Sequence, residues 1–263
     1  QREKRLAADP SCCSINARTS SLDNLDILVG QENGEVLLIE GLTMTVRGRF
    51  NAGGVLNPPR VTDVKWVPGS ATQFVAAFAN GVLLVFDKDK EDSSSKSSSG
   101  SIDGSERGEF GVSILHPKAS KSNPLARWLV GRGPVNHVAF SADGKMALSC
   151  HDGHARVFDF ATERLLISFR SQYGAMLCSA WSPDNVYLVT GGEDDLVMVW
   201  NVRDRCPVAR CHGHNSWISA VSFDTHMCEL DADAVPGVVS GANYRFVSVA
   251  QDGRACVWDL NEG

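Results

Sequence analysis

Three residues near the C-terminal end of the chain have the side chains of a hydrolytic triad: His214, Ser248 and Asp252. In such a triad the serine attacks, the histidine takes its proton and the aspartate orients the histidine. The spacing of these residues favours another role. A Gly-His before one strand, a serine on the next, an aspartate in the turn and Trp258 on a third strand can form one buried hydrogen-bonded network. We therefore predict a structural tetrad, no catalytic residues and no enzymatic activity.

A second group has side chains that bind zinc: Cys206, Cys211, His212 and His214. Zinc sites usually need two pairs of ligands that converge in space. Here His214 already has a place in the tetrad, and Cys206 lies beside a proline in a connection. We expect neither a metal nor a cofactor.

These side chains must be positioned by strands and turns, and the chain repeats one such arrangement five times. A short apolar strand stops at a polar turn and a second apolar strand follows. Tight turns of this type need positive φ, which Gly and Asn accept at low cost. The turns are Asn33-Gly34, Asn80-Gly81, Asp152-Gly153, Asp194-Asp195 and Asp252-Gly253, and the strands after them read EVLLIE, VLLVFD, HARVFD, LVMVWN and RACVWD.

The spacing of the hairpins indicates a repeat fold. Successive turns are separated by steps of 47, 72, 42 and 58 residues, against about 40–45 residues for a WD40 propeller blade. We predict an all-β WD40 propeller with about five recognisable blades here and seven in the full protein. The predicted parts are a segment of uncertain structure at 1–24, a partial propeller at 25–263, and two insertions, a Ser-rich disordered one at 88–107 and a shorter one at 225–243.

Composition and charge narrow the classes of partner and the cellular compartment that we expect. The 25 Lys and Arg against 31 Asp and Glu give a net charge of −6, and no basic stripe is present, so we expect no nucleic-acid partner. No apolar run reaches the roughly 18 residues of a membrane span, so we expect no membrane association. The eight cysteines include no CxxC pair and no signal peptide opens the chain. These features predict a reduced, intracellular protein. We expect it in the cytoplasm and also in the nucleus.

Two aromatic residues lie in connections between predicted blades. Trp217 comes three residues after His214, and Tyr173 lies in the equivalent connection one blade earlier. Both connections belong to one face of a propeller. Exposed Trp and Tyr often anchor binding partners, although either ring could fold down onto the next blade instead. We predict that Tyr173 and Trp217 bind a partner.

Four segments resemble the family of WD repeat protein 20, fungal CreC and the dystrophia-myotonica WD-repeat protein. The irregular Asn-Pro-Leu-x-Arg-Trp connection makes this resemblance specific. The segments are VTDVKWVPGS (61–70), SNPLARWLVGRGPVNHVAFSADGK (122–145), TGGEDDLVMVW (190–200) and HGHNSWISAVSFD (212–224).

This resemblance implies a seven-bladed, non-catalytic propeller that binds and activates a ubiquitin-specific cysteine deubiquitinase. It also implies that aromatic residues at the positions of Tyr173 and Trp217 dock the enzyme, with Phe usual where this chain has Tyr173. Other WD-repeat proteins in the same complex are further expected partners.

Two alternatives stay open at this point. Trp200-Asn201-Val202-Arg203 differs by one residue from the Trp-Asp-x-Arg sequence of substrate receptors for cullin-type ubiquitin ligases. Short motifs of this kind also occur by chance. The chain could equally be a general protein-interaction adaptor. Co-purification with a ubiquitin-specific protease would distinguish the deubiquitinase scaffold from both.

Overall fold

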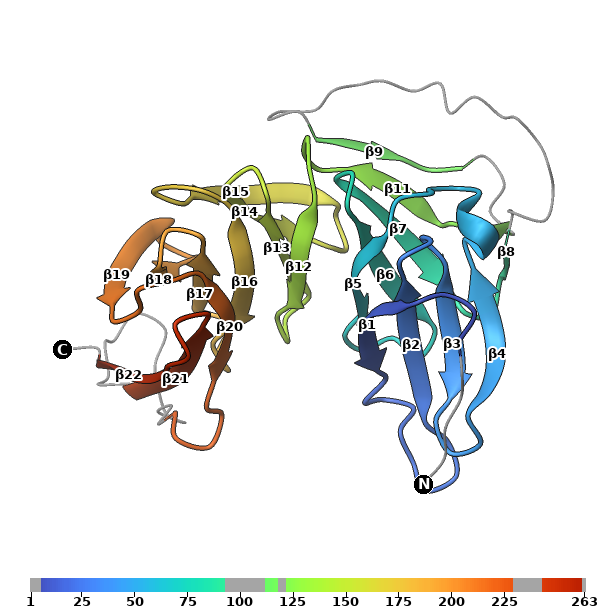
Figure 1. The fold of residues 1–263 in the computed structure, drawn as a ribbon, viewed down its shortest axis with the longest axis horizontal. Helices are drawn as coiled ribbons and strands as arrows, with labels where there is room; N and C mark the ends of the chain where they lie inside the picture. Colours follow the sequence, from blue (N-terminus) through green and yellow to red (C-terminus); the bar gives the residue numbers. More distant parts are fainter. Residues whose placement is uncertain (1–5, 93–111, 118–121, 229–242, 262–263) are drawn as a thin grey trace. The chain divides into compact units, whose positions relative to one another are not determined.

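The computed structural model describes residues 6–92, 112–117, 122–228 and 243–261 (Figure 1). The described elements are β-strands and one short 3-10 turn, η1 (Ala52–Gly54), as the all-β prediction requires. The chain forms two compact units, residues 1–136 and 137–263, with the boundary inside β12. Each unit is described separately.

The first unit contains two larger sheets and one small pair of strands. Its sheets, in order across each one, are β1 (Pro10–Ile15), β2 (Asp26–Gln31), β3 (Val36–Glu40) and β4 (Thr45–Phe50); β5 (Val61–Trp66), β6 (Gln73–Phe78), β7 (Val82–Asp87), β11 (Ala126–Leu129) and β9 (Ser113–Leu115); and β10 (Ser122–Asn123) beside β8 (Glu91–Asp92).

The second unit contains three antiparallel sheets whose strands follow one another in chain order. They are β12 (Val135–Phe140), β13 (Lys145–Cys150), β14 (His154–Asp159) and β15 (Arg164–Arg170); β16 (Met176–Trp181), β17 (Tyr187–Gly192), β18 (Leu196–Asn201) and β19 (Cys206–His212); and β20 (Ile218–Phe223), β21 (Asn243–Ala250) and β22 (Ala255–Asn261).

The five predicted hairpins are the second and third strands of the five larger sheets. Their turns have the predicted positive φ, which is 84° at Gly34, 80° at Gly81 and Gly153, and 74° at Gly253. In the fourth hairpin Asp195 takes this conformation, with φ 62°. Most residues in the hairpin strands of the first four sheets are buried, which is why they read as continuous apolar runs.

The structure differs from the sequence prediction at the N-terminus. Strand β1 lies inside the 1–24 segment and pairs with β2, so the first sheet begins before residue 25. The residues of β1, PSCCSI, show no apolar alternation that would predict a strand. The two predicted insertions, 88–107 and 225–243, lie mostly outside the described residues; β8 at 91–92 and a turn at 225–228 are the parts that can be described.

Neighbouring sheets approach closely at a glycine in the hairpin. A Cβ atom added to Gly191, on β17, would lie 2.4 Å from Cγ2 of Ile218, the first residue of β20. Ile218 is fully buried. In the first unit Gly30 on β2 relates in the same way to Val61 on β5, with a nearest approach of 2.7 Å to that side chain. Each glycine therefore lets the next sheet pack against its own.

This packing predicts a large effect of one methyl group. Gly191→Ala should lower stability by about 1–3 kcal/mol, because the added carbon overlaps the buried Ile218 and the strands must separate. Gly48→Ala is the control: it lies on β4, and the nearest atom to its added Cβ is 3.2 Å away on the Phe50 ring. Equal melting temperatures for the two variants would contradict the packing argument.

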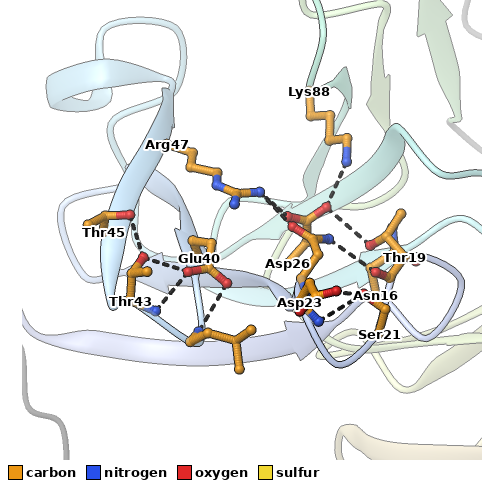
Figure 2. Close-up of polar contacts among 12 residues, drawn as sticks. Asn16, Thr19, Ser21, Asp23, Asp26, Glu40, Thr43, Thr45, Arg47 and Lys88 are labelled. Carbon is orange, nitrogen blue, oxygen red and sulfur yellow. Dashed lines mark hydrogen bonds and ion pairs between the residues drawn. The ribbon is translucent and has the colours of Figure 1, made fainter.

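An ion-pair network joins the two sheets of the first unit (Figure 2). Asp26, at the start of β2, is almost fully buried, and its Oδ2 lies 2.7 Å from the ammonium of Lys88, which follows β7. Thr19 donates a hydrogen bond to the same oxygen, and Arg47 lies 3.4 Å from Oδ1. Burial alone would raise the pKa of Asp26, but the hydrogen bond and charge of Lys88, with Thr19 and Asn24, hold that pKa below its usual value.

Removing the buried partner of Asp26 should destabilise the protein. Lys88→Met leaves the buried carboxylate with the Thr19 hydrogen bond and the longer Arg47 contact, at a cost of about 3 kcal/mol. Arg47→Met should cost under about 1 kcal/mol, because the Arg47 side chain is 47% exposed and its contact is longer. Urea unfolding of both variants measures the difference, and a Lys88 variant as stable as the Arg47 variant would show that the buried pair does not join the sheets.

Candidate functional site

The structure joins the four predicted tetrad residues into one chain of hydrogen bonds. Trp258 Nε1 donates to Ser248 Oγ at 2.8 Å, and Ser248 Oγ lies 2.8 Å from His214 Nε2. His214 Nδ1 lies 3.2 Å from Asp252 Oδ2. The strands supply these positions: Ser248 is on β21, Trp258 is on β22, Asp252 is in the turn between them, and His214 precedes β20.

One protonation pattern satisfies every member of this network. The Ser248 oxygen accepts from Trp258, so its own hydrogen is free to point at His214 Nε2, and the Nδ1 hydrogen then points at Asp252. The backbone N–H of Asn215 also donates to the Asp252 carboxylate and lowers its pKa, and the N–H of Arg254 and the His214 ring act in the same direction.

The order Ser–His–Asp is also the order of a hydrolytic triad, and burial distinguishes the two roles. Ser248 has no solvent-exposed surface and His214 is 7% exposed. A nucleophile must reach a substrate carbonyl, whereas this oxygen is enclosed and already accepts a hydrogen bond. The geometry is that of a structural network.

Breaking the network at its centre should lower the stability of the fold and should not abolish a catalytic activity. Ser248→Ala leaves Trp258 Nε1 without its acceptor and His214 without its donor, at about 1–3 kcal/mol. Ser222→Ala, on the exposed side of β20 in the same sheet, is the matched control and should change stability little. A Ser248→Ala melting temperature equal to the parent's would show that the network contributes no stability.

The two predicted binding residues, Tyr173 and Trp217, are both exposed. Their side chains are 77% and 46% exposed, and among the exposed large hydrophobic residues of the described ranges only these two are aromatic. Tyr173 lies between β15 and β16, and Trp217 lies between β19 and β20. Neither ring has folded into the packing between sheets.

Backbone hydrogen bonds hold the connection that carries Tyr173. The N–H of Ser171 donates to Gly153 in the β13–β14 turn, and the N–H of Gln172 donates to the carboxylate of Asp194 in the β17–β18 turn. The N–H of Glu193 donates to the carbonyl of Ala175. The connection is therefore fixed to the turns of two successive sheets.

The connection that carries Trp217 is held in the same way. Leu196 pairs with His212, which places the β17–β18 turn beside the start of this connection. At its other end Gln251, in the β21–β22 turn, donates its N–H to the carbonyl of Trp217 at 3.0 Å. Both rings thus lie at the turn-bearing end of the second unit, on the two sides of the β17–β18 turn.

A small pocket of about 280 Å³ borders Tyr173. The β13–β14 turn forms one wall with His151 and Asp152, and Arg170 and Gln172 lie on the other. The Asp152 carboxylate is neutralised by a two-bond contact to the buried Arg156 guanidinium. Arg170, also in the lining of this pocket, is in none of the ion pairs formed among the described residues.

The remaining sequence candidates lie elsewhere. Within the described ranges, no cluster of three or more His, Cys, Asp or Glu side chains is placed to hold a metal ion. In the Trp-Asn-x-Arg segment the Asn201 side chain bonds to Asp204 and closes the β18–β19 turn. The described residues contain no helix with the length and apolar character that a bilayer crossing requires.

Sequence reasoning missed Gln172, Glu193 and Asp194, whose bonds hold the connection that carries Tyr173, and Gln251, which holds the connection that carries Trp217. The sequence places Glu193 and Asp194 at the predicted turn between the strands of the fourth hairpin. It has no signal that links this turn to the connection around Gln172, some 20 residues earlier.

Comparisons with known proteins give a consistent result. The family model "WD domain, G-beta repeat" matches residues 123–159 and 164–201. The chain is 35% identical over 262 residues to the UBP9-binding protein bun62 of Schizosaccharomyces pombe. The matched region covers 97% of this chain and 46% of that relative. The chain thus spans about half the length of the relative.

A solved structure is similar in fold. The crystal structure of Saccharomyces cerevisiae Sqt1 matches with a TM-score of 0.71 over 97% of this chain and 60% of that one. At 12% identity this likeness concerns the fold alone. Together with the repeat match, it confirms the predicted all-β WD40 propeller class; the number of blades in the whole protein stays a prediction.

Proposed function

This chain belongs to the WD40-repeat proteins, and from that premise we propose that it is a non-catalytic scaffold that binds a ubiquitin-specific deubiquitinase. The observation that carries the proposal is the pair of exposed rings, Tyr173 and Trp217, at one end of the second unit. The relative of 35% identity is named for its binding of UBP9, which supports a protease of that class as the partner. The burial of Ser248 supports a binding role without hydrolysis.

The proposal extends to the consequence of binding. A surface anchored at two points can hold a partner in one orientation and so favour its active conformation, which is how a scaffold activates an enzyme. We therefore propose activation of the deubiquitinase in addition to recruitment. The proposed location is the cytoplasm and also the nucleus, in a complex with further WD-repeat proteins and without nucleic acid or membrane.

Removing both rings tests the docking surface. Tyr173→Ala/Trp217→Ala should weaken binding by about 30-fold per ring, because interface aromatics commonly contribute 2 kcal/mol or more each. The melting temperature should stay near the parent's, because both side chains are largely outside the packed sheets. Binding is measured by titration with the counterpart of UBP9 from the source organism, and activation by the rate of ubiquitin release.

Val208→Ala/Met227→Ala is the matched control. These residues are 44% and 52% exposed and lie at the other end of the strands of the second unit, Val208 near the start of β19 and Met227 after the end of β20, so their loss should leave affinity unchanged. Parental affinity in the ring variant would place the docking surface elsewhere. If the parent binds the protease without increasing its rate of ubiquitin release, the scaffold proposal stands and the activation proposal is wrong.

A further inference from the structure

The surface between the two rings has a charge pattern that specifies the partner further, and this step rests on the proposed function. The β17–β18 turn, which lies between Tyr173 and Trp217, carries Glu193, Asp194 and Asp195 in succession. All three side chains are partly exposed. The turn is thus the middle of the proposed docking surface, with one aromatic ring on either side.

Hydrogen bonds keep the acids in this position. Glu193 Oε2 accepts the N–H of Ala175 at 2.9 Å, and Asp194 Oδ2 accepts the N–H of Gln172 at 3.2 Å. Both bonds tie the turn to the connection that carries Tyr173. The charges therefore have fixed places relative to that ring.

These three carboxylates have no ion pair among the described salt bridges. The cations near this surface come from neighbouring strands and turns. Arg170 borders the pocket at Tyr173, Arg254 follows Gln251 in the turn that bonds to Trp217, and Arg210 lies on β19 two residues before His212. The carboxylates of the β17–β18 turn are therefore the charges that lie between the two rings, with the exposed His212 beside them.

We infer that the deubiquitinase presents Lys or Arg side chains to the β17–β18 turn, between two apolar hollows that receive Tyr173 and Trp217. Complementary charge accelerates association and excludes partners of the wrong sign. The two rings could also stack against the same cations, since aromatic faces attract them. An acidic partner surface would be repelled here.

Neutralising the turn without changing its shape tests this inference. Glu193→Gln/Asp195→Asn removes two negative charges, keeps an oxygen acceptor for Ala175 N–H, and places at 195 a residue type that tolerates positive φ. The matched control is Glu163→Gln/Asp204→Asn, which removes the same charge from the β14–β15 and β18–β19 turns at the opposite end of the sheets.

Association with the UBP9 counterpart is followed by stopped flow at several salt concentrations. The turn variant should associate about tenfold more slowly than the parent at low salt, and its rate should depend less on salt, because the steering charges are gone. The control should match the parent.

The outcomes separate the two proposals. If the ring variant loses binding but the turn variant keeps the parent's association rate and salt dependence, the charge inference is wrong and the docking surface stands. Faster association of the turn variant would mean that the partner is acidic here, which also overturns the inference. If the parent does not bind, the proposed function fails. If the ring variant binds as the parent does, the docking surface lies elsewhere, and the charge inference, which places the turn at the middle of that surface, fails with it.

Discussion

The sheets of each unit can stack only where the hairpin backbone leaves room for the next sheet. Gly191 meets Ile218 and Gly30 meets Val61 at distances that no Cβ atom could share. Each glycine lies three residues before the first residue of its turn, so the same point of the repeat meets the same strand of the next sheet. Close packing of this kind buries both faces of the central strands. The positions of the hairpin turns, and of the connections bonded to them, therefore depend on how the sheets stack.

The sequence predicts the strands that this packing encloses and misses those at the margins. Residues in β6, β7 and β17 are almost all buried and read as apolar runs. Strand β19, CPVARCH, is largely exposed, and β1, PSCCSI, has one large apolar residue, the exposed Ile15. Such strands are formed by backbone pairing with an existing neighbour, which needs no apolar pattern. Sequence pattern therefore locates the centre of each sheet better than its edge.

The site divides along similar lines. The tetrad could be predicted because its members have fixed offsets from a turn, and a buried network needs all of them. The two preceding sheets have a smaller network or none at the same positions. In the β16–β19 sheet Trp200 donates a hydrogen bond to Thr190, and in the β12–β15 sheet Phe158 takes the place of the tryptophan and has no polar atom that needs a partner. The exposure of Tyr173 and Trp217 was not predictable in this way, because it depends on how the connections are bonded to turns distant in sequence.

That bonding explains why a connection between sheets can serve as a binding surface. A flexible loop loses conformational entropy when a partner orders it, and this loss opposes binding. Here the backbone around Tyr173 is bonded to the turns at Gly153 and Asp194, and the backbone at Trp217 is bonded to Gln251. The two rings are exposed while the chain that carries them is already ordered. The stacking that stabilises the fold thus also positions the surface. A substitution at the buried Gly191, which would not touch the partner itself, would therefore change binding by displacing Ile218 and the connection that carries Trp217.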